Sequence, residues 1–240
     1  MKDHFPVLIL IARPAAGKSE IIQALSRISL DDRLERFHIG ALKIFDDFPM
    51  LWTWFEEDEL LETVFKRPRL HTTPAGYFLH NDLWHLLIRR LNLEYIKWRR
   101  DIGDDGTAII EFARGSDHGG YRTALAHFEK NLLEEAAVLY VDVSYEDSLR
   151  KNRARFNHER PDSILEHSLS DEKMDRLYKD CDWEHISAND DQTFTINGVH
   201  IPYAIFPNED DITTTGGEPL EARLETVLSR LWSIYQMPAV

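Results

Sequence analysis

The stretch Val7–Ser19 reads VLILIARPAAGKS. Residues Val7–Ile11 are apolar and rich in β-branched side chains, so they predict a buried strand. The chain then turns through Ala12–Gly17, and Lys18 and Ser19 open a helix. A strand, tight loop and helix start in this order direct backbone N–H groups and a lysine at phosphate oxygens, while the serine hydroxyl binds Mg²⁺. We therefore expect a phosphate-binding loop.

The loop also supplies most of the residues expected to contact a nucleotide. Its spacing fits G-x-x-x-x-G-K-[ST], except that Ala12 stands at the first glycine position. Alanine is restricted there if the backbone needs a positive φ. The simpler alternative is an ordinary strand-to-helix turn with a surface lysine. The residues expected to bind the nucleotide are Arg13, Pro14, Ala15, Ala16, Gly17, Lys18, Ser19 and Glu20, with Asn208, after the last strand, at a base edge.

Composition limits the class of protein. The chain has 240 residues, 43% of them hydrophobic, which suits one α/β domain. A single cysteine, Cys181, excludes an intrachain disulfide and a cysteine-based zinc site. The net charge of −14 disfavours a nucleic-acid partner. No apolar run approaches the ~20 residues of a membrane span, and the short N-terminus lacks a secretory signal, so we expect no membrane partner and a cytoplasmic location.

Alternating strands and helices predict a parallel sheet covered on both faces, which is a three-layer α/β/α fold. Helices are expected at Ser19–Ile28, Tyr121–Ala137 and Leu220–Trp232. Asn197-Gly198 predicts a two-residue hairpin that adds an antiparallel strand. The five predicted core strands are Val7–Ile11, Arg36–Ile39, Ala108–Phe112, Val138–Val143 and Ile201–Phe206.

Two segments interrupt this alternation within the predicted single domain, residues 1–240. The first, Ala41–Arg100, follows the second predicted strand and reads as a mostly helical insertion rich in aromatic residues. The second, Ser148–Trp183, is charged and rich in arginine. We expect the insertion to bind an acceptor and the arginine-rich segment to act as a lid over a nucleotide.

Acidic residues follow two of the predicted strands. Ligands in open α/β sheets bind beyond the carboxyl ends of the strands, so Glu111 is expected beside the loop, where it could hold Mg²⁺-bound water or accept a proton. Arg114 is expected to point at phosphates. Asp46 and Asp47 are both candidates for the base that serves the acceptor, and one of them could instead cap the next helix. A salt bridge is the plain alternative for Glu111.

The predicted lid carries three arginines of interest. On a helix, Arg150 and Arg153 share a face, and Arg155 lies off that face near the predicted helix end. A cationic segment that closes over a nucleotide stabilises the charge that develops in phosphoryl transfer. The alternative is a solvated charged helix.

Together, these motifs resemble those of the P-loop kinases in the nucleoside/nucleotide kinase group, part of the P-loop containing nucleoside triphosphate hydrolase superfamily. The resemblance rests on Ala12–Ser19, on Glu111 with Arg114, and on the R-x-x-R-x-R spacing of the lid arginines. Deoxynucleoside kinases place an arginine directly after the acid, whereas two residues separate them here. The resemblance implies a five-stranded parallel core of order 2-3-1-4-5, a helical acceptor-binding insertion, and ATP with Mg²⁺ as donor.

The sequence therefore predicts an ATP-dependent phosphotransferase, a kinase of a small-molecule hydroxyl or phosphate acceptor such as a nucleoside or nucleotide. Lys18 would hold the β/γ-phosphates. Ser19 would bind Mg²⁺, and Glu111 would hold a Mg²⁺-bound water or act as a base. Asp46 or Asp47 would orient the acceptor. The residues expected to neutralise charge are Arg114, Arg150, Arg153 and Arg155.

Two other functions stay open at this point. The arginines and aromatic residues could serve a kinase of nucleic-acid ends. The missing first glycine could indicate a nucleotide-binding regulatory module without turnover. The sequence also leaves open the acceptor, the choice between ATP and GTP, and whether the chain forms a homodimer.

Overall fold

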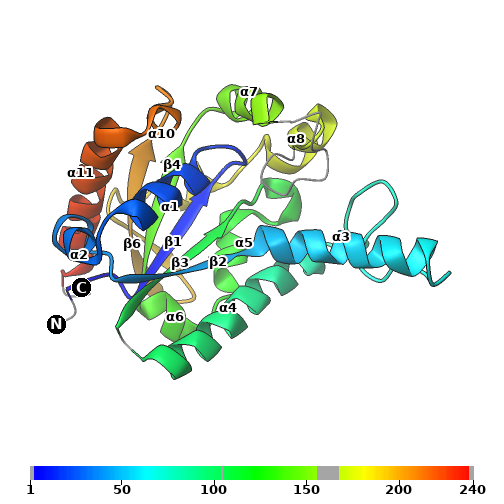
Figure 1. Cartoon of the computed structure of the whole chain (residues 1–240), viewed down its shortest axis with the longest axis horizontal. Helices are drawn as coiled ribbons and strands as arrows, with labels where there is room; N and C mark the ends of the chain where they lie inside the picture. Colours follow the sequence, from blue (N-terminus) through cyan, green and yellow to red (C-terminus); the bar gives the residue numbers. More distant parts are fainter. Residues whose placement is uncertain (1–2, 104, 156–167, 238–240) are drawn as a thin grey trace.

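A computed structural model describes residues 3–103, 105–155 and 168–237. Its centre is a six-stranded sheet of order β2-β3-β1-β4-β6-β5, in which β5 runs antiparallel to β6 and the other pairings are parallel (Figure 1). The predicted α/β class with a mostly parallel sheet is thus confirmed. The strands are β1 (Val7–Ala12), β2 (Ala41–Asp46), β3 (Gly106–Phe112), β4 (Ala136–Asp142), β5 (Thr193–Ile196) and β6 (Val199–Pro207).

Helices pack on both faces of the sheet, and β1 shows why its sequence is continuously apolar. Its alternate side chains enter two separate hydrophobic clusters, Val7 and Ile9 in one and Leu8 and Leu10 in the other, so both of its faces are buried. One face is covered by α4 (Asp82–Ile102), α5 (Gly120–Ala126) and α6 (Lys130–Glu134), and the other by α1 (Lys18–Arg27), α2 (Leu30–Phe37) and α11 (Gly217–Tyr235) (Figure 1).

The predicted hairpin is confirmed. Asn197 and Gly198 connect β5 to β6 with φ values of 52° and 76°. Positive φ at both central residues is what a two-residue turn needs to match the twist of the strands, and asparagine and glycine tolerate it best. The hairpin adds β5 at the edge of the sheet, beside the last parallel strand.

The second strand lies elsewhere than expected. Residues 36–39 were predicted as a strand, but Arg36 and Phe37 end helix α2, and the strand β2 follows at Ala41–Asp46. The side chain of Ser29 caps α2 by accepting a hydrogen bond from the Asp32 N–H at 3.2 Å. Because β2 is an edge strand with mostly half-exposed side chains, it lacks the continuous apolar run that marks a central strand.

The segment Tyr121–Ala137, predicted as one helix, is also different. It contains α5 and α6, and its last two residues already belong to β4. The apolar residues that suggested one helix, Leu125 and Leu132 among them, are buried all the same. Their burial is shared by two short helices and a strand, which one helical period cannot distinguish.

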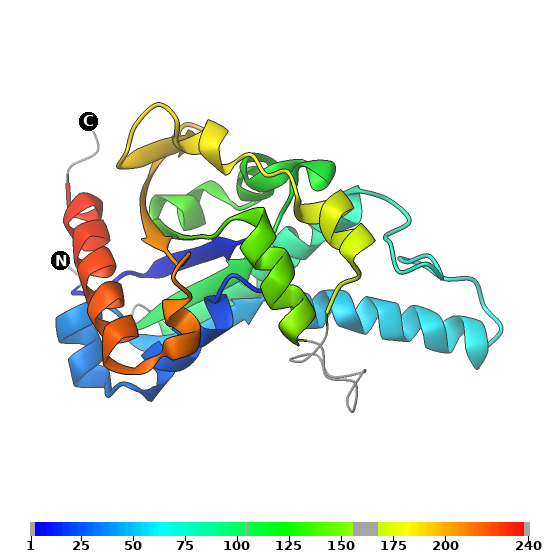
Figure 2. The ribbon, with the colours of Figure 1, turned by 90° about the horizontal axis from the view of Figure 1, so that it is seen from above.

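The insertion is shorter than predicted because β2 occupies its first six residues. What remains is α3 (Asp47–Thr63), a loop over residues 64–81, and α4. Helix α3 and the loop extend away from the sheet (Figure 2). They form the side of the molecule on which the third cavity described below opens.

Within the described residues, the predicted lid contains most of α7 (Tyr145–Arg155) and all of α8 (Asp171–Tyr178), and it ends at the first residue of α9 (Trp183–Ser187). Residues 156–167 of the predicted lid lie outside the described residues. Asn152 of α7 is hydrogen-bonded to Leu169, which lies shortly before α8. Its amide donates to the Leu169 carbonyl at 2.7 Å and its oxygen accepts from the Leu169 N–H at 3.0 Å. Among the helices of the described ranges, none combines the length and apolarity that crossing a membrane requires.

Candidate functional site

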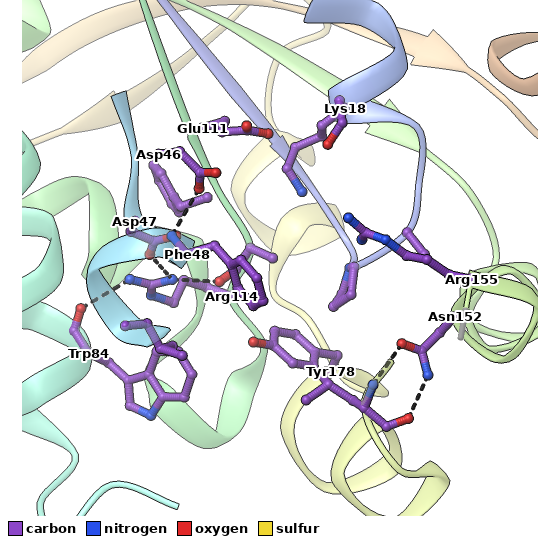
Figure 3. A pocket seen from close by; sticks show the side chains of 17 residues that line it. Lys18, Asp46, Asp47, Phe48, Trp84, Glu111, Arg114, Asn152, Arg155 and Tyr178 are labelled. Atoms are coloured by element: carbon purple, nitrogen blue, oxygen red, sulfur yellow. Dashed lines mark hydrogen bonds and ion pairs between the residues drawn. The ribbon is translucent and has the colours of Figure 1, made fainter. Parts of the chain in front are cut away.

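The carboxyl ends of β1, β2 and β3 meet at a cleft between the sheet and the helices α3, α7 and α8 (Figure 3). Asp46 ends β2 and lies opposite Glu111 of β3 in the strand register. Glu111 in turn lies opposite Leu10 of β1, three residues before the start of the β1–α1 loop, Arg13–Gly17. The register therefore brings the two acids beside the loop. The residues that line this first cavity include Pro14, Ala15, Lys18, Ser19, Asp46, Asp47, Glu111, Arg114 and Arg155.

The β1–α1 loop is shaped to receive an anion. Ala15 and Gly17 adopt positive φ values of 54° and 106°, and helix α1 begins directly afterwards. Among the described residues, no acceptor receives the backbone N–H groups of Gly17, Lys18 and Ser19. Unpaired N–H groups in a left-handed turn at a helix N-terminus form a concave site for negatively charged oxygens.

Gly17 is required for two reasons. Its φ of 106° strains any residue with a side chain, and a Cβ at this position would lie 2.4 Å from the Thr213 Oγ1. The neighbouring Asn208 explains the tight approach, because its amide donates to the Ala16 carbonyl at 2.9 Å and to Thr213 at 2.7 Å. Asn208 is fully buried. The expected contact of Asn208 with a base edge is thus wrong, and its side chain braces the loop instead.

Ala12, at the first glycine position, needs no special backbone. It is the last residue of β1, with extended conformation and complete burial. Positive φ belongs to Ala15 and Gly17, so the alanine adds no strain.

Arg13 does not direct its guanidinium into the cleft. The guanidinium donates hydrogen bonds to the carbonyls of Val143 at 3.4 Å and Lys179 at 3.3 Å, behind the loop. Its side chain therefore anchors the loop to the segment after β4, and any contact of Arg13 with a ligand is left to its backbone. Pro14 is held from the other side, where the Ser148 hydroxyl donates to its carbonyl at 2.7 Å.

Asp46, Glu111 and Lys18 point toward one another at the bottom of the cleft (Figure 3). Burial, followed by the charges of Glu111 and Asp47, raises the pKa of Asp46 to about 7. Burial also raises the pKa of Glu111, although the nearby Lys18 ammonium acts against this rise. The two carboxyls cannot both ionise freely in this position, so they hold a proton between them to higher pH than isolated carboxyls would. Such a pair can exchange a proton near neutral pH.

Asp47 and Arg114 form a buried ion pair with each other. The sequence had suggested Asp47 as a base for the acceptor and Arg114 as a phosphate contact. The Arg114 guanidinium lies 2.7 Å from the Asp47 carboxylate, and the exposed fractions of the two side chains are 1% and 8%. Arg114 also donates to the Trp84 carbonyl at 3.1 Å and lies over the Trp84 ring. Arg114 lines the first cavity, but in this structure its guanidinium is engaged by Asp47 and the Trp84 carbonyl. The pair fastens the start of α3 to the end of β3.

We expect Asp47→Asn to lower the free energy of unfolding by about 3–5 kcal/mol, because it leaves the Arg114 charge buried without its counter-ion. Denaturant melts should show this loss. Replacing both partners, as Asp47→Asn with Arg114→Met, should recover part of it, since no charge is then left unpaired. A double variant that is less stable than the single one would contradict a buried ion pair.

The lid arginines do not share one role. Arg153 points to α8, where its guanidinium lies 2.6 Å from the Asp171 carboxylate. Arg150 lies 2.9 Å from Asp147 and lines a second cavity beside the loop. Arg155, expected to lie off the shared face, reaches the first cavity and also lines the second (Figure 3). Arg150 and Arg153, which helical spacing places on one face, thus have different acidic partners in the structure.

Two further cavities adjoin the first. The second has a volume of about 560 Å³ and shares Ala15, Lys18, Ser19 and Arg155 with it. Gly17 and Glu20 line this cavity, and so does Asp211, which forms a 2.7 Å ion pair with Lys151. The third has a volume of about 450 Å³ and shares Phe48, Leu51, Trp84, Leu169 and Tyr178 with the first. The first cavity thus shares walls with both of the others, and Lys18 lies in the wall common to the first and the second.

Several residues of the cleft were not predicted as site residues. Trp84 lines the first and third cavities, and its ring stacks on His118 at 4.2 Å between centroids. Burial lowers the pKa of His118 to about 3, so its imidazole is neutral beside Arg114. Tyr178 and Phe48 line the first and third cavities. No local pattern marks these residues, because the cleft forms only when α3, α4 and α8 come together.

A metal ion would depend on ligands from outside the chain. Within the described ranges, no group of three or more histidine, cysteine, aspartate or glutamate side chains could hold a metal ion. Mg²⁺ commonly keeps several waters and binds through one or two protein oxygens plus phosphate oxygens. Ser19, exposed at the junction of two cavities, fits that mode of binding.

Comparisons with known proteins add no family. No protein-family model matches the chain, and no curated protein matches its sequence. The function is therefore argued from the site itself.

Proposed function

We propose that this chain is a P-loop kinase, which transfers the γ-phosphoryl group of ATP to a small-molecule acceptor. The observation that carries the proposal is the position of Lys18. It begins the helix after an anion-binding loop, and its side chain points at the carboxyls of Asp46 and Glu111 from two neighbouring strands (Figure 3). Phosphoryl transfer needs this combination of a phosphate cradle, a cation and a base for the acceptor.

The strand order gives further support. Counted along the chain, the parallel strands β1, β2, β3, β4 and β6 stand in the order β2-β3-β1-β4-β6. This agrees with the order 2-3-1-4-5 implied by the resemblance to nucleoside and nucleotide kinases. In such sheets, the cleft at the carboxyl ends of the strands is the usual ligand site.

The three cavities suggest how the two substrates are arranged. The second cavity, beside Gly17 and Arg150, would hold the nucleoside part of ATP. Its triphosphate would follow the loop to Lys18, and the acceptor would enter from the third cavity. Phosphoryl transfer would then take place in the first cavity, which shares walls with the other two.

In the proposed step, the hydroxyl oxygen of the acceptor forms a bond to the γ-phosphorus of ATP. Asp46 accepts the proton that this hydroxyl loses. The bond between that phosphorus and the β,γ-bridging oxygen breaks, and its electron pair leaves with ADP. Lys18 and the loop N–H groups bind the phosphate oxygens. Glu111 and Asp46 then hold the accepted proton between their carboxyls. Mg²⁺ held at Ser19 would offset the negative charge of the phosphates.

The direct test is ADP formation from ATP and Mg²⁺ with a panel of small-molecule alcohols and monophosphates. We expect ADP to form with some acceptors and a phosphorylated product to appear in equal amount. ATP binding without transfer to any acceptor would instead favour the regulatory module. Ala12 no longer motivates that alternative, because its extended backbone needs no glycine.

A matched pair of lid variants tests the arginine assignment. We expect Arg155→Ala to lower kcat by about 10²-fold or more, in keeping with the loss of a charged group that stabilises the transition state. Arg153→Ala should change kcat less than threefold, because Arg153 is an exposed partner of Asp171. Steady-state ADP formation by both variants provides the comparison. Equal losses in the two variants would contradict the assignment.

A further inference from the structure

The third cavity indicates what kind of acceptor the enzyme takes. We infer that the acceptor is a hydroxyl compound whose body is a flat, largely apolar ring system, held by stacking in this cavity. The inference rests on the proposed function, because it assigns the cavity to the acceptor of that reaction.

Aromatic rings are the most frequent apolar side chains in the walls. Within the part of the chain that the structure describes, seven aromatic side chains line the cavity, from α3, the 64–81 loop, α4 and α8: Phe48, Trp52, Phe55, Tyr77, Phe78, Trp84 and Tyr178. Neighbouring walls meet in tilted and edge-to-face contacts, with centroids 5.6 Å apart for Phe55 and Phe78 and 4.8 Å apart for Phe78 and Trp84. A volume of about 450 Å³ suits a molecule of two or three rings.

The cations beside the cavity belong to its wall. Lys173 and Arg176, one turn apart on α8, lie 5.2 and 4.6 Å from the centre of the Tyr77 ring. Arg176 also lies 3.6 Å from Asp117. A Cβ on Gly76 would come within 2.3 Å of the Lys173 ammonium, so the glycine leaves room for the lysine. The two cations thus fasten the 64–81 loop to α8.

The polar side chains that line the cavity are Glu56, Glu59, Asn81, Asp117, Lys173 and Arg176, and all but Lys173 are exposed. Asn81 is the single side-chain amide among the described residues that line the cavity, and it is exposed at the start of α4. Glu56 and Glu59 lie on the exposed face of α3 at the rim. A compact, hydroxyl-rich acceptor would meet polar groups that are mostly exposed to solvent, whereas a ring can stack on several aromatic faces. Stacking recognises a flat shape and tolerates differences at the edge.

The wall is held in place before a ligand arrives. Asp58 of α3 is fully buried, and its carboxylate accepts from the N–H groups of Leu70, His71 and Thr72 at 2.8, 2.9 and 2.6 Å. These bonds tie the 64–81 loop to α3 and set the distance between Phe55 and Phe78. The cavity shares Phe48 and Trp84 with the first cavity, which Asp46 and Glu111 line. A stacked ring therefore can present its hydroxyl to the carboxyl pair.

Isothermal titration calorimetry without nucleotide tests the inference, with 2-naphthalenemethanol, ribose and adenosine as probes. We expect the naphthalene alcohol to bind at least tenfold more tightly than ribose. Phe55→Ala should weaken its binding at least tenfold, and Phe55→Leu, which keeps an apolar side chain but removes the ring, should also weaken it. Leu60→Ala is the matched control, because Leu60 is exposed on the same helix and does not line the cavity.

The outcomes separate this inference from the proposed function. Ribose binding as tightly as the naphthalene alcohol, or unchanged binding of the alcohol by both Phe55 variants, would overturn the inference. The inference would also be overturned if adenosine bound most tightly of the three probes and lost its affinity in Asn81→Ala. The cavity would then recognise the polar edge of a base by hydrogen bonding. Ring binding as expected, with no ATP consumed with any acceptor of the panel, would keep the preference of the cavity for rings but defeat the kinase proposal, and with it the assignment of the cavity to an acceptor. Transfer to ribose at the same rate in wild type and Phe55→Ala would do the reverse.

Discussion

Lys18→Met is expected to lower phosphoryl transfer by about 10²–10³-fold, the usual cost of removing one positioned group that stabilises transition-state charge. The methionine keeps the length of the side chain but removes the ammonium that faces the carboxyl pair and the loop. The fold should persist, because Lys18 is half-exposed and, within the described residues, forms no ion pair at 4 Å or less. Circular dichroism and a thermal melt verify folding, and ADP formation measures the loss.

The matched control is Lys130→Met on α6. Lys130 is two-thirds exposed and pairs with Glu134 at 3.5 Å, away from the cleft. Its replacement should change activity less than twofold, so that a general effect of losing one positive charge is excluded. Wild-type turnover by folded Lys18→Met would remove the basis of the kinase proposal.

Asp46→Asn is expected to have opposite effects on activity and stability. Activity should fall by about 10²–10⁴-fold, the range of a positioned general base. Stability at pH 8 should rise, because the buried charge is replaced by a neutral amide. Asparagine keeps the helix cap, since its side-chain oxygen can still accept the Phe48 N–H, which Asp46 receives at 2.9 Å.

The pH dependence follows from the raised pKa of Asp46, about 7. A carboxyl that holds its proton more tightly when folded stabilises the fold at low pH, and this stability is lost as the pH rises through the folded pKa. Wild-type activity should therefore increase from pH 6 to 8 as the base ionises, while wild-type stability decreases. The gain in melting temperature of Asp46→Asn should be larger at pH 8 than at pH 5.

Rate profiles and thermal melts over this pH range measure both effects. Glu111→Gln is the companion variant, because it removes the neighbouring negative charge that helps to raise the Asp46 pKa. Its activity profile should shift to lower pH. A flat stability difference between wild type and Asp46→Asn at all pH values would show that Asp46 is ionised throughout and not coupled to Glu111.

Much of the fold can be predicted from local patterns. The continuous apolar run of β1 predicts a strand buried on both faces, and Asn197-Gly198 predicts the hairpin, because each pattern has one dominant physical cause. The edge strand β2 was misplaced, since its half-exposed side chains give a weaker signal than the apolar residues just before it. Ser29 followed by Asp32 was a start signal for α2 that could have corrected the error.

The site was less predictable because its contacts join distant segments. Strand ends correctly brought Asp46 and Glu111 to the cleft, but the partner of Arg114 is Asp47, 67 positions earlier in the chain. Helical spacing placed Arg150 and Arg153 on one face. In the structure, Arg153 pairs with Asp171 on α8, and Arg155 lines the cleft. Local sequence gives the chemical character of a side chain, and tertiary packing decides whether that character is used for structure or for binding.

The extended backbone of Ala12 has a consequence for how this loop can vary among proteins. Since the residue continues β1 and is completely enclosed, volume limits what may replace it, and torsional freedom does not. Serine or glycine should be accepted there, while valine should be rejected for its bulk. Proteins with another small residue at the position of Ala12 would not match a pattern that requires two glycines. They would still form the same turn if they keep a glycine at the position of Gly17.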